Sequence, residues 1–488
     1  MLFRCSFAYI LLYCLGLFNT NASAQAEIYP FTEGAKTAND FSVTIDGKEV
    51  QVYDAPVAAV AQFGIDTETT IKIRSEFDIK RVDIRPKSLN IQYTLIENVL
   101  SIKLIRPCKI SVELNANIMR PLFIFANAKT TDKPNANDSK VKFFKAGKIY
   151  DIGRVAINSN ETVYIEAGAI VRGSFKSNNS ENITLRGNGI LEAKSKPGND
   201  TNGKFIEDWG RTVNFKKCKN VKILDIIILD SHTWDVVPDL CTNVIIKNIK
   251  IASGNPADDG MDIVSCQDVL IEDCFIRAKD DCIAIKAFDK DTVNRDVLNI
   301  NVKRCTFWNA EWGNAFEIGF ETRTQRIANI KLEDCDIIHV TGGAAFSIHL
   351  GDWAKVENIQ IENIRIEDAT QKLVDMAIFF SYFSKDNPFT SEDFMKNHYL
   401  QGTWDNVIKV NSSDKNKYEA NRGSINNVVF KNIEVLEGNY PFSVIEGFSE
   451  KHKITNVSFE NVKIYGRKIK QLEDMRLFVK HASGISIK

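Results

Sequence analysis

The sequence lacks an excess of charge of either sign, long apolar runs beyond its first residues, and helical periodicity. Among 488 residues, 62 Lys and Arg face 63 Asp and Glu, so the basic surface that nucleic-acid-binding proteins use is not expected. After the N-terminal segment, the chain contains no run approaching the roughly 18 apolar residues of a transmembrane helix. The sequence therefore predicts a globular monomer with neither nucleic acid nor a membrane as its partner.

The first residues have the pattern of a secretory signal. Arg4 gives a positive start, residues 6–18 are apolar, and Ala22-Ser23-Ala24 forms a small-residue cleavage site. Cleavage there removes one basic residue and leaves 61 basic and 63 acidic residues, a net charge of −2. We expect residues 1–24 to be a signal peptide and the mature protein to be secreted or periplasmic.

A repeated segment dominates the chain from about residue 182 onward. It has the form N-[VI]-x-[IVLF]-x-x-[ICV]-x-[IVF], and its clear copies begin at 220, 243, 268, 299, 329, 358, 427 and 456. Alternating apolar residues, many of them β-branched, predict strands, and a period of 20–50 residues indicates a stacked architecture. We predict a right-handed parallel β-helix over residues 141–488, with one coil per repeat and an irregular insertion near 370–420.

The segment ahead of the repeats has a different pattern. Residues 27–130 contain alternating strands such as "TTIKIRSEF" and "NIQYTLIENVLSIKLIRP", joined by Asp-Gly or Glu-Asn turns. They predict a small antiparallel β-sandwich domain over residues 25–135. A polar, turn-rich linker follows at 130–140. The predicted fold class is therefore all-β.

The cysteines follow the repeat. Eight remain after the signal is removed, and two sets of three occupy equivalent positions of consecutive copies: Cys218, Cys241 and Cys266, and Cys274, Cys305 and Cys335. Stacking places them about 4.8 Å apart, which is within disulfide reach. Three thiols in a row cannot all pair, however, and free cysteine suits a core. We therefore predict buried, reduced ladders.

Two Asp-Asp pairs, at 258–259 and 280–281, fall in equivalent turns of neighbouring coils. Stacking then brings Asp259, Asp280 and Asp281 onto one face of the helix. Asp is common at turns, so the pairs alone are compatible with solvated turns. Equivalent placement on successive coils favours chemistry, because crowded carboxylates raise the pKa of at least one member.

In this context the segment 210–288 resembles glycoside hydrolase family 28, the polygalacturonase-like β-helix hydrolases. The family's N-T-D-G is matched by Ala257-Asp258-Asp259-Gly260, and its G-D-D by Lys279-Asp280-Asp281. Residues 306–340 also resemble the dextranase-like family 49 of the same clan. The resemblance implies an inverting glycoside hydrolase in which Asp280 is the general acid, while Asp259 and Asp281 hold and deprotonate the attacking water.

Further residues are expected to contact the substrate. Tryptophans fall near coil ends, where their rings could stack on sugars or simply shield the flank of the helix: Trp209, Trp234, Trp308, Trp312 and Trp353. Lys286 either contacts substrate or balances the acids. The expected substrate-binding set is Asp258, Lys286, Asn314, Glu317, His349, Trp234 and Trp308.

Two departures from the family concern the substrate. The family's G-H-G-x-S-I-G is matched by residues 313–319, so Asn314 replaces the histidine. Its R-I-K, which binds a uronate carboxylate, is matched by Ser347-Ile348-His349. Loss of both cations predicts that unmodified polygalacturonate is not the preferred substrate. Arg323 and Arg326 are the nearest replacement cations in sequence. A neutral or differently decorated α-linked galactan, glucan or rhamnogalacturonan-type chain is expected instead.

Two other functions fit the scaffold. A polysaccharide lyase could hold Ca²⁺ with the Asp pairs and use Lys or Arg as base. A non-catalytic glycan-binding β-helix is the other alternative, although binding alone has no need of mutually repelling carboxylates. His232, His339 and His349 lack metal-ligand spacing, so we expect no metal and no cofactor.

Overall fold

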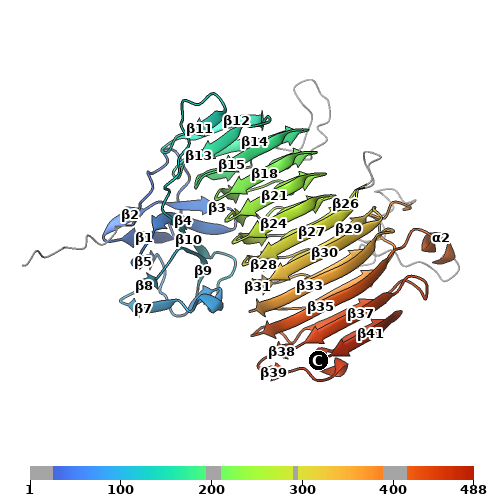
Figure 1. The fold of residues 1–488 in the computed structure, drawn as a ribbon. Coiled ribbons are helices and arrows are strands. Elements are labelled where there is room, and N and C mark those ends of the chain that lie inside the picture. Colours follow the sequence, from blue (N-terminus) through green and yellow to red (C-terminus); the bar gives the residue numbers. More distant parts are fainter. Residues whose placement is uncertain (1–25, 194–209, 289–294, 388–414) are drawn as a thin grey trace, which may run out of the picture.

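The computed structural model describes residues 26–193, 210–288, 295–387 and 415–488, almost all of them in strands and loops (Figure 1). The expected signal peptide, Trp209 and much of the predicted insertion lie outside the described residues. Helical segments within them are short: η1 (Lys87–Leu89), α2 (Lys415–Glu419) and η2 (Leu472–Met475). Among these residues we find no helix with the length and apolar character needed to cross a membrane.

The N-terminal part is a sandwich of two five-stranded sheets, ordered β2-β1-β5-β8-β7 and β3-β4-β10-β9-β6. The prediction of antiparallel pairing is wrong at one place, because β10 runs parallel to β4. Strand β10 returns from β9 as an antiparallel neighbour and therefore points along β4. The strands are β1 (Phe41–Ile45), β2 (Lys48–Val50), β3 (Val52–Ala55), β4 (Ala58–Ile65), β5 (Thr69–Ser75), β6 (Val82–Arg85), β7 (Gln92–Ile96), β8 (Val99–Leu104), β9 (Cys108–Leu114) and β10 (Leu122–Ala128).

The remaining strands form a right-handed parallel β-helix, as predicted, and their pairings define three faces. The first face contains β11 (Val141–Phe144), β13 (Thr162–Ile165), β15 (Glu181–Arg186), β18 (Lys219–Leu224), β21 (Thr242–Lys247), β24 (Gln267–Glu272), β27 (Val297–Lys303), β30 (Arg326–Glu333), β33 (Lys355–Ile366), β35 (Ser424–Val435), β37 (Ile454–Glu460) and β41 (Ala482–Ile487).

The second face contains β12 (Ile149–Ala156), β14 (Ile170–Asn178), β16 (Ile190–Glu192), β19 (Ile227–Leu229), β22 (Lys250–Ala252), β25 (Phe275–Ala278), β28 (Thr306–Asn309), β31 (Asp336–Val340) and β38 (Lys463–Ile464), the last paired with β39 (Arg467–Lys468). The third contains β17 (Val213–Lys216), β20 (Val236–Asp239), β23 (Met261–Val264), β26 (Ile283–Ala287), β29 (Phe316–Thr322), β32 (Ala344–Leu350), β34 (Lys372–Ile378), β36 (Phe442–Glu446) and β40 (Leu477–Lys480).

The asparagine that begins most repeats has a structural cause. Asn220 and Asn243 adopt left-handed backbone conformations with φ of 57° and 56°, which Asn tolerates better than most residues. Each side-chain amide donates to the corresponding asparagine of the preceding coil, at 2.9 Å from Asn220 to Asn182 and 2.7 Å from Asn243 to Asn220. The repeated Asn therefore both bends the chain and joins successive coils.

The prediction of cysteine ladders is confirmed. All eight cysteines of the described residues are buried and unpaired by disulfides. In one ladder, the Sγ of Cys241 accepts the backbone N–H of Cys218 at 3.4 Å, and the Sγ of Cys266 accepts that of Cys241 at 3.3 Å. The thiols thus fill the core and satisfy backbone donors at the same turn.

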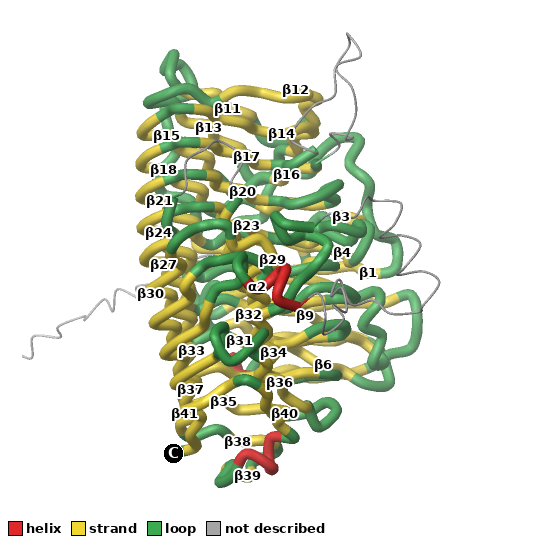
Figure 2. Tube along the Cα trace, turned by 90° about the vertical axis from the view of Figure 1, so that its right-hand side faces the viewer, coloured by secondary structure: helices red, strands yellow, loops and turns green. Residues whose placement is uncertain are grey.

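The sandwich lies along the second face of the helix (Figures 1 and 2). Its sheet β3-β4-β10 contributes Phe123 and Phe125, which contact Phe275 with ring centroids 5.0 and 5.5 Å apart. Ile227 and Ile338 belong to the same buried cluster. Because this domain covers the second face, the functional site must be sought elsewhere on the coils.

Candidate active site

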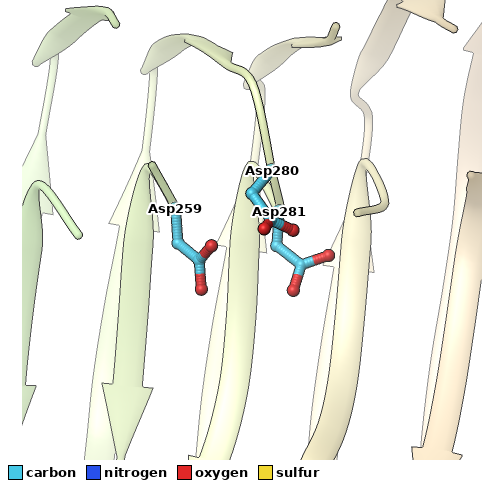
Figure 3. A group of neighbouring side chains, drawn as sticks. All are labelled: Asp259, Asp280 and Asp281. Carbon is cyan, nitrogen blue, oxygen red and sulfur yellow. The ribbon is translucent and has the colours of Figure 1, made fainter. Parts of the chain in front are cut away.

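Three aspartates meet at the turns between the second and third faces. Asp259 lies in the turn from β22 to β23, and Asp280 and Asp281 lie in the turn from β25 to β26, one coil later (Figure 3). The backbone N–H of Gly260 donates to the carbonyl of Asp281 at 2.8 Å, which fixes the register of the two turns. One carboxylate oxygen from each aspartate lies within 4.8 Å of the others. The juxtaposition expected from the repeat is confirmed.

Glycine at two positions allows the coils to approach. A Cβ at Gly260 would lie 2.6 Å from the carbonyl oxygen of Cys282, and one at Gly313 would lie 2.3 Å from Oδ1 of Asp280. Gly313 also has a φ of 61°, which disfavours other residues. The glycines thus let neighbouring turns pack directly against the acids.

The three aspartates differ in exposure and ionisation. Asp259 and Asp281 are buried, whereas Asp280 is half-buried. Burial, and next the charge of Asp259, raises the pKa of Asp280 to about 7. Burial, then Asp259, Asp280 and Glu317, raises the pKa of Asp281 well above its usual range. The cluster therefore holds protons near neutral pH, and Asp280 is the member that reaches the surface.

Lys286 supplies positive charge to this cluster. Its Nζ lies 2.8 Å from Oδ2 of Asp259 and 2.9 Å from Oδ1 of Asp262. Burial lowers the pKa of Lys286, but the charges of Asp259 and Asp262 oppose burial and raise it above its usual range. Of the two roles open to this lysine, the geometry favours balancing the acids over reaching a substrate.

Two acids were missed by sequence reasoning. Asp235 is one coil before Asp259, since its N–H donates to the carbonyl of Asp259 at 2.8 Å, and Asp262 touches Lys286. Burial raises the pKa of Asp235 to about 7, with a side-chain hydrogen bond to Asp258 opposing the shift. Stepping back one repeat from Asp259 would have found Asp235. Strand alternation after Gly260 would have found Asp262.

A row of outward-facing positions, polar except for Ala284, continues from the acids along the third face. Strand pairing aligns Asp262, Ala284, Glu317, Ser347 and Asp375 on five successive coils. The intervening positions, such as Ile318 and Ile348, point into the hydrophobic core. The row therefore lies on the outer side of the coil.

Asn314 and His349 connect this row to the catalytic turn. The backbone N–H and the Nδ2 of Asn314 donate to Oδ1 of Asp281 at 2.7 and 3.1 Å. The imidazole of His349 lies between Glu317, at 3.0 Å, and Asp375, at 3.3 Å. Burial lowers the pKa of His349, but these two carboxylates more than compensate and raise it to about 10. The imidazole is thus positively charged at neutral pH.

Three of the expected substrate-binding residues are almost fully buried. Trp308 is 2% exposed and packs against Phe123 of the sandwich, with ring centroids 5.7 Å apart. Asp258 and Glu317 are 0 and 1% exposed. Their burial, by the sandwich for Trp308 and by neighbouring coils for the two acids, argues against direct contact with a substrate.

Trp234 is the expected aromatic that remains accessible beside the acids. It is half-buried, with the Lys286 ammonium 4.1 Å and the Arg211 guanidinium 4.5 Å from its ring centroid. Phe288 stacks with it at 6.1 Å. Aromatic groups on this side of the acids can form a platform for a sugar ring.

Comparison with known proteins agrees with this arrangement. The profile of glycosyl hydrolases family 28 matches residues 135–387, more than half of the chain. The protein belongs to this family. Among its family 28 relatives, a probable polygalacturonase of Vitis vinifera is 36% identical over 153 residues, which cover 30% of this chain and 31% of the relative. A polygalacturonase of Persea americana is 21% identical over 200 residues, covering 40 and 42%. The chain thus spans about a third to two fifths of the length of these relatives.

Comparison with solved structures covers more of this chain than the sequence relatives do. Dex49A from Penicillium minioluteum matches with a TM-score of 0.66 and 13% identity, covering 95% of this chain and 96% of that one. A hyperthermoactive exopolygalacturonase from Thermotoga maritima matches with a TM-score of 0.50 and 16% identity, covering 67 and 85%. At these identities the likeness concerns the fold alone.

Proposed function

We propose that this protein is an inverting glycoside hydrolase that cleaves α-glycosidic bonds in a polysaccharide. Asp280 acts as the general acid, and Asp259 and Asp281 position and deprotonate the water. The observation that carries the proposal is a cluster of three carboxyl groups in which the least buried member, Asp280, has its pKa raised to about 7. The secreted or periplasmic location, the monomeric state and a division into a 25–135 sandwich and a 141–488 catalytic domain belong to the same proposal.

The acid step needs a carboxyl group that is protonated and accessible. Asp280 meets both conditions, because its pKa near 7 keeps a large share of it protonated at neutral pH. Its proton goes to the glycosidic oxygen as the bond to the anomeric carbon breaks. The other sugar then departs as an alcohol.

The base step needs a carboxylate that can accept a proton from water, and burial together with its acidic neighbours opposes this at Asp281 by raising its pKa. The ammonium of Lys286 stabilises the charge on Asp259, and two N–H donors of Asn314 stabilise the charge on Asp281. Oxygens within 4.8 Å of each other can share one bridging water at hydrogen-bond distance. That water attacks the anomeric carbon and gives up a proton to the pair.

The distance between the carboxyl groups does not decide the stereochemistry of the reaction. These groups are about 5–5.5 Å apart in retaining enzymes and 6.5–9.5 Å apart in inverting enzymes. The closest oxygens of this cluster are nearer to each other than either range. Inversion rests on the family resemblance and on the water position between Asp259 and Asp281. Proton NMR of the first-formed product tests it: an α-linked substrate should give the β-anomer before mutarotation. An initial α-anomer would exclude inversion.

We also propose that the sugar bound beside His349 is not a free uronate. Ser347 and His349 occupy the positions at which the family resemblance predicts a carboxylate clamp. Ser347 is 1% exposed, and the charge of His349 is shared by Glu317 and Asp375. Arg323, a possible replacement, lies 3.4 Å from Asp352, and Arg326 lies 3.7 Å from Glu357. These cations are therefore already engaged by protein carboxylates.

A comparison of substrates tests this proposal. A charge-assisted bond to a carboxylate contributes about 1.5–3 kcal/mol, so two missing contacts reduce kcat/KM on polygalacturonate severely. We expect kcat/KM on a neutral or rhamnogalacturonan-type α-linked chain to exceed that on polygalacturonate by at least about 100-fold. Efficient cleavage of unmodified polygalacturonate would overturn the substrate proposal and leave the acid–base roles standing.

A further inference from the structure

Glu317 is the centre of a hydrogen-bond network behind the catalytic turn. Its Oε2 accepts from Nδ2 of Asn314 at 2.9 Å, from the hydroxyl of Ser347, and from Nδ1 of His349 at 3.0 Å. Three donors converging on one oxygen favour the ionised carboxylate. A buried carboxylate of this kind requires a compensating charge, and His349 is the cation in contact with it.

The orientation of Asn314 is determined by its surroundings. Its Oδ1 accepts the backbone N–H of Ala344 at 2.9 Å, so its amide nitrogen must face the carboxylates. The nitrogen then donates to Asp281 at 3.1 Å and to Glu317 at 2.9 Å. Asn314 therefore joins the catalytic carboxylate to the Glu317–His349 pair, which has no direct contact of its own with Asp281 among the hydrogen bonds of the described residues.

His349 has both ring nitrogens engaged by carboxylates. Nδ1 faces Glu317, and Nε2 faces Asp375, which in turn pairs with Lys372. An imidazole that donates from both nitrogens is positively charged. The other charged groups near this unit are the three catalytic aspartates, with Lys286 on β26 and Glu321 on β29.

We propose that Glu317 and His349 are a positioning pair that sets the orientation and charge of Asp281 through Asn314. The inference rests on the proposed function, since it assigns the pair a role in preparing one of its two water-binding carboxylates. Neither member is a catalytic residue, because Glu317 is buried and acts through Asn314, and His349 acts through Glu317.

The sign of each contribution follows from electrostatics. A negative Glu317 disfavours ionisation of Asp281, whereas a positive His349 reduces that effect. Removing the charge of His349 should therefore make Asp281 harder to ionise. Removing the charge of Glu317 should make it easier. Removing both charges should bring the ionisation of Asp281 back towards that of the wild type.

Three variants test this proposal through the pH dependence of kcat/KM. His349→Gln should move the acid limb of the profile up by roughly 0.5–1 pH unit, and Glu317→Gln should move it down by a similar amount. The double variant should lie between them, close to wild type. His481→Gln is the matched control, because His481 pairs with exposed Glu450 on the last coils, and its profile should not move. Acid limbs that coincide in all variants, or that move in the same direction, would overturn the proposal.

A second measurement does not depend on turnover. In protein with ¹⁵N-labelled histidine, the resonances of His349, assigned by their loss in His349→Gln, should show both nitrogens protonated at pH 8. In Glu317→Gln the imidazole should titrate at lower pH. A neutral His349 at pH 8 would overturn the proposal even if no substrate is cleaved. Conversely, hydrolysis by wild type that is lost in Asp280→Asn, with coincident acid limbs, would leave the proposed function intact and remove this inference alone.

Discussion

Two of the buried clusters of charge in the described residues differ in how they are paired. At the interface between sandwich and helix, Arg85 lies 3.2 Å from Glu113, 2.8 Å from Glu367 and 2.6 Å from Glu437. His339 bridges Glu113 and Asp368 at 3.0 and 2.9 Å. By contrast, the turns with the aspartate cluster contain Asp258, Asp259, Asp262, Asp280 and Asp281, and Lys286 contacts two of them, Asp259 and Asp262.

The difference separates a structural cluster from a chemical one. A buried ion pair is expensive to desolvate but is strongly destabilising to break, so the ion pairs of Arg85 fix how the two domains sit together, although burial raises the pKa of Glu367 in this cluster to about 7. A cluster with surplus negative charge cannot ionise completely, so it keeps protons near neutral pH. The ion pairs at the interface stabilise one arrangement of the two domains, whereas the crowded aspartates lower stability and hold the proton that the proposed mechanism requires.

Asp280→Asn gives the largest expected effect, and it distinguishes most clearly a cluster needed for catalysis from one needed for stability. Loss of a general acid typically costs about 10²–10⁴-fold in rate, so kcat should fall by at least that range on the best substrate. Far-ultraviolet circular dichroism should be unchanged. Wild-type turnover by the folded variant would exclude the assigned acid.

The same variant should be more stable than wild type, whereas a substitution that breaks the Arg85 ion pairs should be less stable. Because the folded-state pKa of Asp280 is raised to about 7, this group lowers stability progressively as pH rises from about 4 to 7. The gain in Tm on Asp280→Asn should accordingly be larger at pH 8 than at pH 4. A Tm gain that is independent of pH would contradict the buried, raised acid.

Arg85→Met tests the interface cluster. We expect it to lower the stability of the protein and to leave its catalytic rate unchanged. It leaves Glu113 and Glu367 buried without their cation, and breaking a buried pair costs about 3–5 kcal/mol. We expect a corresponding fall in the free energy of unfolding, with kcat retained below the transition. Arg81→Met is the control, since the Arg81–Asp83 pair is largely exposed on the arginine side, and it should change stability by less than about 1 kcal/mol. Equal losses in the two variants would remove the distinction between the clusters.

The comparison also shows which features of the molecule could be predicted from its sequence. The Asn at most repeat starts, the cysteine ladders and the stacking of Asp259 on Asp281 all follow from one repeat and its register. Contacts from outside the repeat do not. Trp308 sits at a coil position that suits a sugar platform, and what decides its role is the sandwich sheet that covers it.

Asp375 shows a second limit of prediction from sequence, in addition to contacts from outside the repeat. It lies where the repeat is irregular, so only the pairing of β32 with β34 aligns it with Ser347 and brings it to His349. The parallel pairing of β4 with β10 was unpredictable for a similar reason. Strand order within a sandwich depends on which distant strands bury the most apolar surface together, and local patterning carries no such information.

Lys250→Met should stabilise the protein and shows what an unpaired cation does at the interface. Lys250 is fully buried in the column of Ile227 and Phe275 beneath the sandwich, and its Nζ donates to the carbonyl of Asp225 at 2.9 Å. Burial, and next the charge of Lys109, lowers the pKa of Lys250 to about 7. The free-energy cost of burying Lys250 therefore grows as pH falls from about 10.5 to 7.

We expect Lys250→Met to raise the free energy of unfolding by roughly 1–4 kcal/mol at pH 7. The gain should shrink towards pH 10 and is limited by the carbonyl left unpaired. Lys247→Met is the matched control, because Lys247 is about half-exposed and paired with Glu272. A loss of stability in Lys250→Met exceeding that of the control would contradict the assignment.

The smallest expected effect concerns the cysteine ladders, where we expect a reducing agent to leave the Tm of the protein unchanged. Burial raises the pKa of Cys274 and, as the first of several causes, that of Cys305, so these thiols stay protonated and unreactive in the folded protein. A disulfide typically adds about 2–4 kcal/mol, so its reduction would lower Tm visibly. We expect identical Tm values with and without dithiothreitol. Alkylation of the unfolded, unreduced mature chain should add eight labels by mass spectrometry. Fewer labels together with a Tm that falls on reduction would show that neighbouring coils are cross-linked, and that this neutral core holds its coils together by a covalent bond that the charged clusters lack.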